Sequence, residues 1–458
     1  MKIINPATEQ IIKEIPEDDR SSLATKFQLL KEATIAWSAH PLPERVKILQ
    51  KFAALLADKL EELAAVLTAE VGKPLQQSRN EINGARTRIK WLTENAGKYL
   101  GDEIMTQEDT LEEIISYDPL GVICNISAWN YPWLVGVNVF VSALLAGNTV
   151  MYKPSEFSSG TGLEIEKLLK EAGIPENVFH TAIGTGEVGK ILLDLPFDGY
   201  FFTGSYKTGK YIYEKCAAKM VPCQLEMGGK DPLYVTNDIA DIAQVAAGTA
   251  DGAFYNNGQS CCSVERIYVH EEVYDAYLAE FLKEVSSWKT GDPTTAGVYL
   301  GPLTRKDQLT ILEQQVADAV QKGAKVLTGG KRIKGNGYYF EATVLTGVNH
   351  EMEVMREESF GPVIGIMKVQ NDEEAVRRML DTSYGLTAAV YSRDRIRAEV
   401  LLNKMNVGSG YWNCCDRVSA PLPWSGRNHS GFGVALSHAG LRSFTRPKAW
   451  HLRLPLPC

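Results

Sequence analysis

The first hundred residues carry apolar positions at helical spacing. Ser21 and Ser22 are placed to cap a first helix, and Pro43 suits the first turn of a second. Gly72 and Pro74 mark the next break. The apolar positions that recur at helical intervals are Leu23, Phe27, Leu30, Val46, Leu49, Ala53 and Leu56. This pattern predicts a helical N-terminal region.

The pattern changes at Gly121, where short apolar runs begin to alternate with helical stretches. Strands that alternate with helices predict parallel sheets covered on both faces, with ligands at the carboxyl ends of the strands. A second α/β region starts near Asp231 and includes a helix over 273–289. The predicted strands are 122–126, 149–152, 179–183, 200–203, 266–270 and 387–391.

One long stretch lacks charge altogether. No charged residue occurs between Asp118 and Lys153, and its central part is apolar enough to be mistaken for a membrane span. Four asparagines punctuate the stretch, and Pro132 interrupts it. Hydrocarbon penalises such polar groups, so the stretch is predicted to be a buried strand, loop, helix and strand.

Composition narrows the class of protein. A chain of 458 residues has room for two or three domains. Its net charge of −8 and the lack of a dense basic patch give no reason to expect nucleic acid as a partner. The N-terminus lacks the apolar core of a secretion signal. Eight cysteines, four of them in adjacent pairs, do not resemble a disulfide framework, so a cytoplasmic location is expected.

Two short motifs carry the chemistry. Cys261 lies in the run 258–262, Gly-Gln-Ser-Cys-Cys, and Glu226 lies in the run 225–230, Leu-Glu-Met-Gly-Gly-Lys. A thiolate is a nucleophile for covalent catalysis, and a carboxylate can activate water to release the product. Neither motif settles the function alone, because an isolated cysteine is usually a small buried hydrophobe and an isolated glutamate a surface charge.

Together with three further runs, these motifs resemble the NAD(P)-dependent aldehyde dehydrogenase family. The further runs are 129–132 (Trp-Asn-Tyr-Pro), 202–205 (Phe-Thr-Gly-Ser) and 357–362 (Glu-Glu-Ser-Phe-Gly-Pro). The five occur in the family's chain order, and the resemblance extends over nearly the whole chain. It implies an α/β fold with a Rossmann-like NAD-binding domain (1–100 and 120–230) and a catalytic domain (231–430). It also implies a small β oligomerisation arm with a tail (101–119 and 431–458), in a homodimer or homotetramer.

The resemblance implies roles for three catalytic side chains. Cys261, rather than Cys262, would attack the aldehyde carbon to give a thiohemiacetal. Asn130 would hold the developing oxyanion, and pre-aimed donors of this kind are worth about 3–4 kcal/mol. Glu226 would activate the water that hydrolyses the thioester, which favours release of the free acid over transfer to coenzyme A. No metal site is expected, and the small-molecule partner is an aldehyde.

The resemblance also implies a set of cofactor contacts. The implied cofactor-binding residues are Ile126, Trp129, Lys153, Ser155, Glu156, Gly184, Gly204, Ser205, Met227, Glu358 and Phe360. Among them, Glu156 bears on the choice of cofactor, because a carboxylate accepts hydrogen bonds from a free ribose 2′-hydroxyl and repels a 2′-phosphate. NAD is therefore the expected cofactor, with NADP possible through Lys153 and Ser155.

Several positions depart from the family pattern or concern the substrate. Val139 and Ala435 stand where many members carry a lysine and a glutamate, so any proton relay served by that pair must run differently. Tyr131 and Trp424 would give the substrate tunnel apolar walls. Arg417 is either a rim charge or a site for an anionic tail, as in a semialdehyde dehydrogenase. The adjacent Cys414 and Cys415 have no role that the sequence explains.

Two further functions stay open at this point. A non-catalytic structural member of the family would be expected to lack Cys261, Asn130 or Glu226, and all three are present. A cofactor-independent thiol esterase would leave the run 357–362 and the glycine turns unexplained.

Overall fold

The computed structural model describes residues 1–454 and begins with a hairpin and four helices. The N-terminal strands β1 and β2 precede helices α1 to α4, which confirms the helical prediction for this region. Residues 455–458, the end of the predicted tail, lie outside the described part. The bounds are β1 (Lys2–Ile4), β2 (Ile11–Glu14), α1 (Arg20–Ala39), α2 (Leu42–Asp58), α3 (Leu60–Val71) and α4 (Leu75–Leu100).

The cap of α1 differs from the prediction. Asp19, not Ser21 or Ser22, is the N-cap: its carboxylate accepts the Ser22 backbone N–H at 2.7 Å, and Ser22 Oγ accepts the Asp19 N–H at 3.0 Å. This capping box satisfies two backbone donors at once, which starts the helix earlier than a lone serine would. The other two predictions are confirmed, because Pro43 lies in the first turn of α2 and α3 ends at Gly72.

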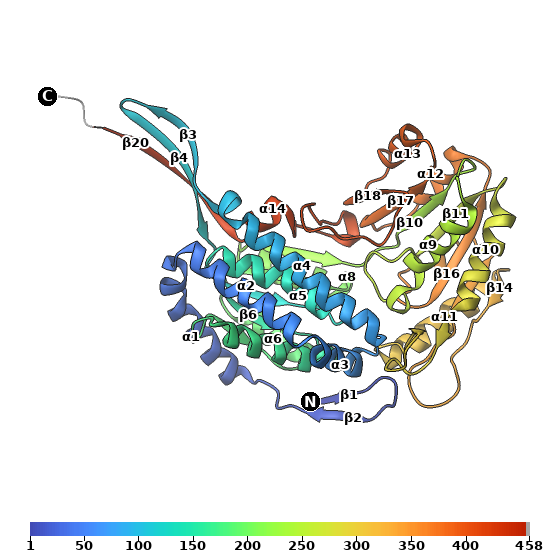
Figure 1. Ribbon diagram of the computed structural model, residues 1–458, viewed down its shortest axis with the longest axis horizontal. Helices are drawn as coiled ribbons and strands as arrows, with labels where there is room; N and C mark the ends of the chain where they lie inside the picture. The colour runs from blue at the N-terminus through green and yellow to red at the C-terminus, as the bar shows by residue number, and fades with distance from the viewer. Residues whose placement is uncertain (455–458) are drawn as a thin grey trace.

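A six-stranded sheet forms the first α/β region. Its strand order is β19-β9-β8-β5-β6-β7, with every pair parallel except β19 with β9. The strands are β5 (Val122–Ile126), β6 (Thr149–Lys153), β7 (Phe179–Thr181), β8 (Gly199–Gly204), β9 (Cys223–Met227) and β19 (Gly431–Phe432). The connecting helices are α5 (Pro132–Leu145), α6 (Ser159–Ala172), α7 (Gly186–Asp194) and α8 (Tyr206–Ala217). The predicted parallel sheet is confirmed (Figure 1).

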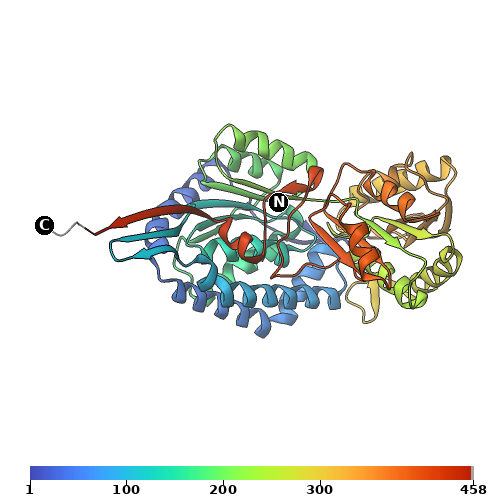
Figure 2. The same cartoon turned by 90° about the horizontal axis from the view of Figure 1, so that it is seen from above.

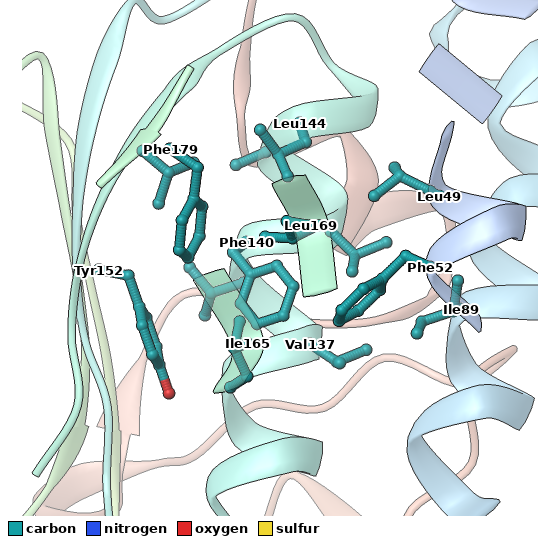
Figure 3. Close-up of a cluster of buried hydrophobic side chains, with 14 of the residues drawn as sticks. Leu49, Phe52, Ile89, Val137, Phe140, Leu144, Tyr152, Ile165, Leu169 and Phe179 are labelled. Atoms are coloured by element: carbon teal, nitrogen blue, oxygen red, sulfur yellow. The ribbon is translucent and has the colours of Figure 1, made fainter. Parts of the chain in front are cut away.

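The uncharged stretch folds as predicted into β5, α5 and β6. Helix α5 is buried along nearly its whole length between the sheet and helices α2, α4 and α6. Figure 3 shows Phe140 at the centre of this core, with Phe52 on one side and Tyr152 and Phe179 on the other. Burial of each such side chain contributes about 1.5–3 kcal/mol. Within residues 1–454, no helix is long and apolar enough to cross a membrane.

A seven-stranded sheet forms the second α/β region, a separate lobe in Figure 2. Its order is β14-β15-β16-β11-β10-β17-β18, parallel except where β14 pairs with β15. The strands are β10 (Pro232–Val235), β11 (Arg266–His270), β14 (Lys325–Thr328), β15 (Thr343–Thr346), β16 (Val363–Val369), β17 (Thr387–Tyr391) and β18 (Ser409–Trp412). Its helices are α9 (Ile242–Phe254), α10 (Tyr274–Ser287), α11 (Lys306–Gln321), α12 (Asp372–Leu380) and α13 (Arg395–Leu402).

A three-stranded antiparallel arm projects from the first lobe, at the left of Figure 1. It consists of β3 (Glu103–Glu108), β4 (Leu111–Pro119) and β20 (Thr445–Arg453). Before entering the arm, the chain adds β19 to the six-stranded sheet and packs α14 (Ser437–Arg442) beside α4. The arm carries large exposed apolar side chains, namely Ile104, Met105 and Leu452.

Candidate active site

The loop that carries Cys261 has a fixed and unusual backbone. Helix α9 ends in a 3₁₀ turn, Tyr255–Gly258, in which Asn256 and Asn257 have φ of 53° and 58°. Asparagine tolerates this left-handed region better than most residues. Gly258 follows at φ 67°, and a side chain there would collide with the Gly361 carbonyl oxygen. The loop therefore presents Cys261, partly exposed, at a defined position.

A cavity of about 1120 Å³ lies beside this loop. It collects residues from both lobes, including helix α4, the start of α5, the end of β9 and the segment 413–424. The predicted site residues that line it are Cys261, Glu226, Tyr131, Arg417 and Trp424. Residues from four separate segments of the sequence thus share one chamber.

Glu226 lies near the end of β9 and is 8% exposed. Gln224 Nε2 donates to its Oε1 at 2.9 Å. Burial raises the pKa of Glu226 to about 7, and the Gln224 hydrogen bond and the charge of Arg88 oppose that rise. A carboxyl with a pKa near neutrality is half ionised at physiological pH, which suits a general base.

Asn130 links the helical region to the Cys261 loop. It lies between β5 and α5, and its Nδ2 donates to the Gln259 carbonyl oxygen at 3.1 Å. The backbone carbonyl oxygen of Asn130 accepts hydrogen bonds from Lys73 Nζ at 2.8 Å and from Asn256 Nδ2 at 3.2 Å. The bond to Gln259 holds the side-chain amide of Asn130 against the chain two residues before Cys261, and the other two bonds hold its backbone.

Cys261 and Cys262 differ in their surroundings. Cys262 is 4% exposed, and its Sγ donates to Asp416 Oδ1 at 3.0 Å. Contact with Cys261, burial and the nearby Asp416 carboxylate raise the pKa of Cys262 well above its ordinary value. A thiol held in the neutral form is a poor nucleophile. The partly exposed Cys261 is the better placed of the two.

The residues predicted for the adenosine end gather after β6. Lys153 is 3% exposed, donates to the Pro154 carbonyl oxygen at 3.1 Å and forms no ion pair within residues 1–454. Ser155 Oγ donates to Glu156 Oε2 at 3.2 Å. Gly184 follows β7 at φ 154°, where a side chain would collide with Val188. A buried ammonium with spare protons beside a carboxylate fits a group rich in hydroxyls.

The residues predicted for the phosphate and nicotinamide end lie at or near strand ends. Ser205 is the N-cap of α8 directly after Gly204, so the helix N-terminus is directed at this site. Trp129 packs edge-on against Phe360, with ring centroids 5.4 Å apart. Ile126 and Met227 lie at the ends of β5 and β9. Because anions bind at helix N-termini, this arrangement fits a dinucleotide phosphate.

Glu358 approaches the Leu-Glu-Met-Gly-Gly turn closely. Its Oε1 accepts the Gly229 N–H at 3.2 Å, and a side chain at Gly228 would overlap the carboxylate. Burial raises the pKa of Glu358 to about 8, with the nearby Glu265 acting in the same direction. This close approach requires a residue without a side chain at position 228.

Sequence reasoning missed two buried ion pairs that position these loops. Lys230 Nζ donates to Glu265 Oε2 at 2.6 Å, and Glu265 accepts the backbone N–H groups of Ser359 and Phe360, each at 3.1 Å. The second pair, Lys73 with Glu81, supports the 130–133 turn through the Asn130 carbonyl oxygen and the Trp133 N–H. The sequence does not show which of its many charges pair, because the pairing depends on tertiary structure.

The two positions that depart from the family pattern, Val139 and Ala435, are buried. Val139 is 3% exposed within the α5 core, and Ala435 is 1% exposed and pairs with Trp424 through their backbones. Arg417 is exposed at the cavity wall. Cys415 packs against α9 and donates to the Gly248 carbonyl oxygen at 3.7 Å, so it is a structural thiol.

Comparison with known proteins identifies the class. Residues 1–450 match the model of the aldehyde dehydrogenase family. The chain is 34% identical to aminoaldehyde dehydrogenase 1, peroxisomal, of Pisum sativum, over 97% of this chain and 91% of the relative. It is 31% identical to succinate-semialdehyde dehydrogenase [NADP(+)] of Deinococcus radiodurans, over 97% and 93%.

A solved structure shares the whole architecture. A point mutant of betaine aldehyde dehydrogenase from Staphylococcus aureus, in complex with NAD⁺, superposes with a TM-score of 0.94 at 28% identity, covering 99% of this chain and 94% of the other. The chain therefore belongs to the aldehyde dehydrogenase family. The predicted α/β fold class and the predicted aldehyde-oxidising enzyme are confirmed.

Proposed function

We propose that this enzyme oxidises an aldehyde to the free carboxylic acid with NAD(P), through Cys261, Asn130 and Glu226. One observation carries the proposal: a partly exposed cysteine and a buried carboxyl with a pKa of about 7 line the same cavity. This pairing serves a two-stage reaction, in which one group forms a covalent intermediate and the other releases it. A structural member of the family would have no use for it.

The first stage belongs to Cys261 and Asn130. The Cys261 thiolate attacks the aldehyde carbon, and negative charge develops on the aldehyde oxygen as the tetrahedral thiohemiacetal forms. The Asn130 side-chain amide, held by Gln259 while Lys73 holds the backbone of the same residue, is the donor assigned to that oxygen. When bound, the nicotinamide cofactor supplies the acceptor for the hydride that leaves this carbon.

The second stage belongs to Glu226. The ionised carboxylate takes a proton from a water molecule as that water attacks the thioester carbonyl carbon. The carbon–sulfur bond then breaks, the acid is released, and Cys261 returns to its thiolate form. Val139 and Ala435 offer no ionisable group for a further relay, so the proton on Glu226 is expected to leave through the cavity.

The cofactor would be held by residues at or after the ends of β5, β6, β8 and β9 and by the loop before β16. Lys153 and Glu156 are assigned to the adenosine ribose, Ser205 to a phosphate and Glu358 to the nicotinamide ribose. Glu156 favours NAD, because its carboxylate repels a 2′-phosphate. NADP use stays possible through Lys153 and Ser155, and one relative is named for NADP(+).

The substrate region has apolar walls and a charged rim. Tyr131 and Trp424 would contact the carbon chain of the aldehyde, while Arg417 stands at the exposed wall. Medium-chain or aromatic aldehydes fit such walls. The relatives named for aminoaldehydes and for succinate semialdehyde show that members at this distance differ in the charge of the tail.

The arm formed by β3, β4 and β20 is proposed as the oligomerisation element of a homodimer or homotetramer. Its exposed Ile104, Met105 and Leu452 are the kind of apolar surface that a partner subunit covers. Light scattering on a chain with polar replacements at these three positions tests this, since a smaller particle is expected. A cytoplasmic location is proposed on the unpaired thiols of residues 1–454.

A screen of NADH or NADPH formation tests the proposed function. Aliphatic, aromatic and carboxylated aldehydes are offered with NAD and with NADP in parallel, to the wild type and to Cys261→Ala. We expect oxidation of at least one class by the wild type, more efficiently with NAD, and none by the variant. Undiminished oxidation by Cys261→Ala would overturn the assignment.

A further inference from the structure

Arg88 is a buried cation at the wall of the active-site cavity. It lies on α4, is 9% exposed, and lines the same chamber as Cys261 and Glu226. Its Nη1 donates to Asn138 Oδ1 at 2.8 Å and to the Leu134 carbonyl oxygen at 3.3 Å. These two bonds tie one end of the guanidinium to α5.

The other donors of Arg88 are unused by the protein. Within residues 1–454, its Nε and Nη2 donate to no acceptor and the side chain forms no ion pair. The fully buried Arg266 is a contrast, since its Nε donates to the Lys230 carbonyl oxygen at 2.9 Å and its Nη2 donates to the Met379 carbonyl oxygen at 3.0 Å. A buried charge without a partner is costly, so its retention needs an explanation.

The unused donors face a chamber that a ligand enters. A guanidinium offers two parallel N–H groups that match a carboxylate in geometry and charge. Arg88 is also within the electrostatic reach of Glu226 and Cys261, so an anion bound to it would lie close to the reacting group. We propose that Arg88 binds a carboxylate at the far end of the aldehyde substrate, an inference that rests on the proposed function and specifies its substrate class.

The acidic residues of the cavity are less available for the opposite charge. Asp416 Oδ1 already accepts from Ser260 Oγ at 3.1 Å and from the Cys262 thiol. Asp251 Oδ1 accepts from the Tyr299 hydroxyl at 2.5 Å, and Asp241 caps helix α9. Each of these carboxylates uses an oxygen within the protein, whereas the Nε and Nη2 of Arg88 donate to no acceptor in residues 1–454, and this difference favours an anionic tail over a cationic one.

Arg88 also accounts for selectivity better than Arg417. Arg417 is exposed, and a rim charge in contact with water contributes little to binding. Arg88 is screened from solvent, and a charge-assisted hydrogen bond in such a place commonly changes binding about 10- to 100-fold. If Arg88 binds the carboxylate, substitution of Arg88 should selectively impair oxidation of the anionic aldehyde. If Arg417 binds it, substitution of Arg417 should do so.

The test compares three aldehydes of similar length in kinetic assays. They are succinate semialdehyde (anionic), methyl 4-oxobutanoate (neutral) and 4-aminobutanal (cationic). Arg88→Gln should lower the ratio of kcat/KM for the anionic aldehyde to kcat/KM for the neutral one about 10- to 100-fold. The ratio is the readout because loss of the Arg88 charge also acts on the pKa of Glu226, and so on both aldehydes. Arg88→Lys should retain part of the preference. The matched control is Arg86→Gln, on the same helix, where the wild-type side chain bonds Asn83 instead.

A binding measurement tests this inference independently of the proposed function. Calorimetric binding of succinate to Cys261→Ala, which needs no turnover, should weaken at least about tenfold when Arg88→Gln is added. Equal losses for anionic and neutral aldehydes, a wild-type preference for 4-aminobutanal, or a selective loss in Arg417→Gln alone would overturn the role of Arg88. If the wild type oxidised no aldehyde, the proposed function would fail. The succinate-binding measurement would still test whether Arg88 binds a carboxylate.

Discussion

Lys73 holds the turn that carries Asn130 and Tyr131, and removing it should affect stability and catalysis separately. Its side chain is fully buried and paired with the equally buried Glu81. Lys73 Nζ donates to the Asn130 carbonyl oxygen at 2.8 Å and lies 3.7 Å from the centroid of the Tyr131 ring. Glu81 Oε1 accepts the Trp133 N–H at 2.9 Å. The pair therefore fixes residues 130–133 from two sides.

The magnitude follows from the charge that each variant leaves behind. Lys73→Met strands Glu81 as an unpaired buried carboxylate, which should lower the free energy of unfolding by about 3–5 kcal/mol. Replacing both residues, as Lys73→Met with Glu81→Leu, removes the charge and should restore most of that loss. The exposed pair Lys90 and Glu94 on α4 is the control, where Lys90→Met should cost less than about 1 kcal/mol.

Activity should not recover with stability. The double variant still lacks the donor to Asn130 and the cation beneath Tyr131, and a small misplacement of a reacting group can lower the rate about 100-fold. Denaturant unfolding and kcat/KM are measured on the same four proteins. A Lys73→Met protein as stable as the wild type would refute the reasoning, and so would a double variant with full kcat/KM.

Three further outcomes are expected. Cys262→Ala should retain most activity, because contact with Cys261, burial and Asp416 raise the pKa of the Cys262 thiol. A dead Cys262→Ala beside an active Cys261→Ala would show that the motif has been misassigned by one residue. Glu156→Ala should narrow the preference for NAD over NADP in kcat/KM; a wild type that uses NADP as well or better contradicts this. A carboxyl whose pKa is about 7 is protonated below that pH, so kcat should fall as pH is lowered through 7. A flat profile from pH 6 to 8 would exclude Glu226 as the base in the rate-limiting step.

Much of the fold was predictable because its strands are continuous apolar runs bounded by glycine or charge. The ranges 122–126, 266–270 and 387–391 match β5, β11 and β17 residue for residue. The first residue of α1 was not predicted correctly. Asp19 and Ser22 are both suitable N-caps, and only the hydrogen bonds between them show that Asp19 is the cap. The spacing of apolar residues reports whether a segment is helix or strand. It does not report which side-chain hydrogen bonds form at the end of a helix.

Site residues were predictable where they belong to one short run of sequence. They were not predictable where folding brings distant residues together. Cys261 and Glu226 come from short runs with their own glycines, and they meet in the cavity. Arg88 lies in an ordinary polar stretch between Arg86 and Lys90, and only the packing of α4 against α5 buries it. The pairing of Lys73 with Glu81 likewise depends on tertiary structure, because periodicity does not record which charges meet.

A single rapid-mixing experiment tests the account most directly. Glu226→Gln is mixed with NAD and an aldehyde that the wild type oxidises, NADH is followed from the first milliseconds, and the protein is then analysed by mass spectrometry. We predict a burst of about one NADH per active site, a slow steady state and an acyl group on Cys261, because the thioester forms but is not hydrolysed. Undiminished steady turnover without a burst, or an acyl group on Cys262, would contradict the roles given to Cys261 and Glu226.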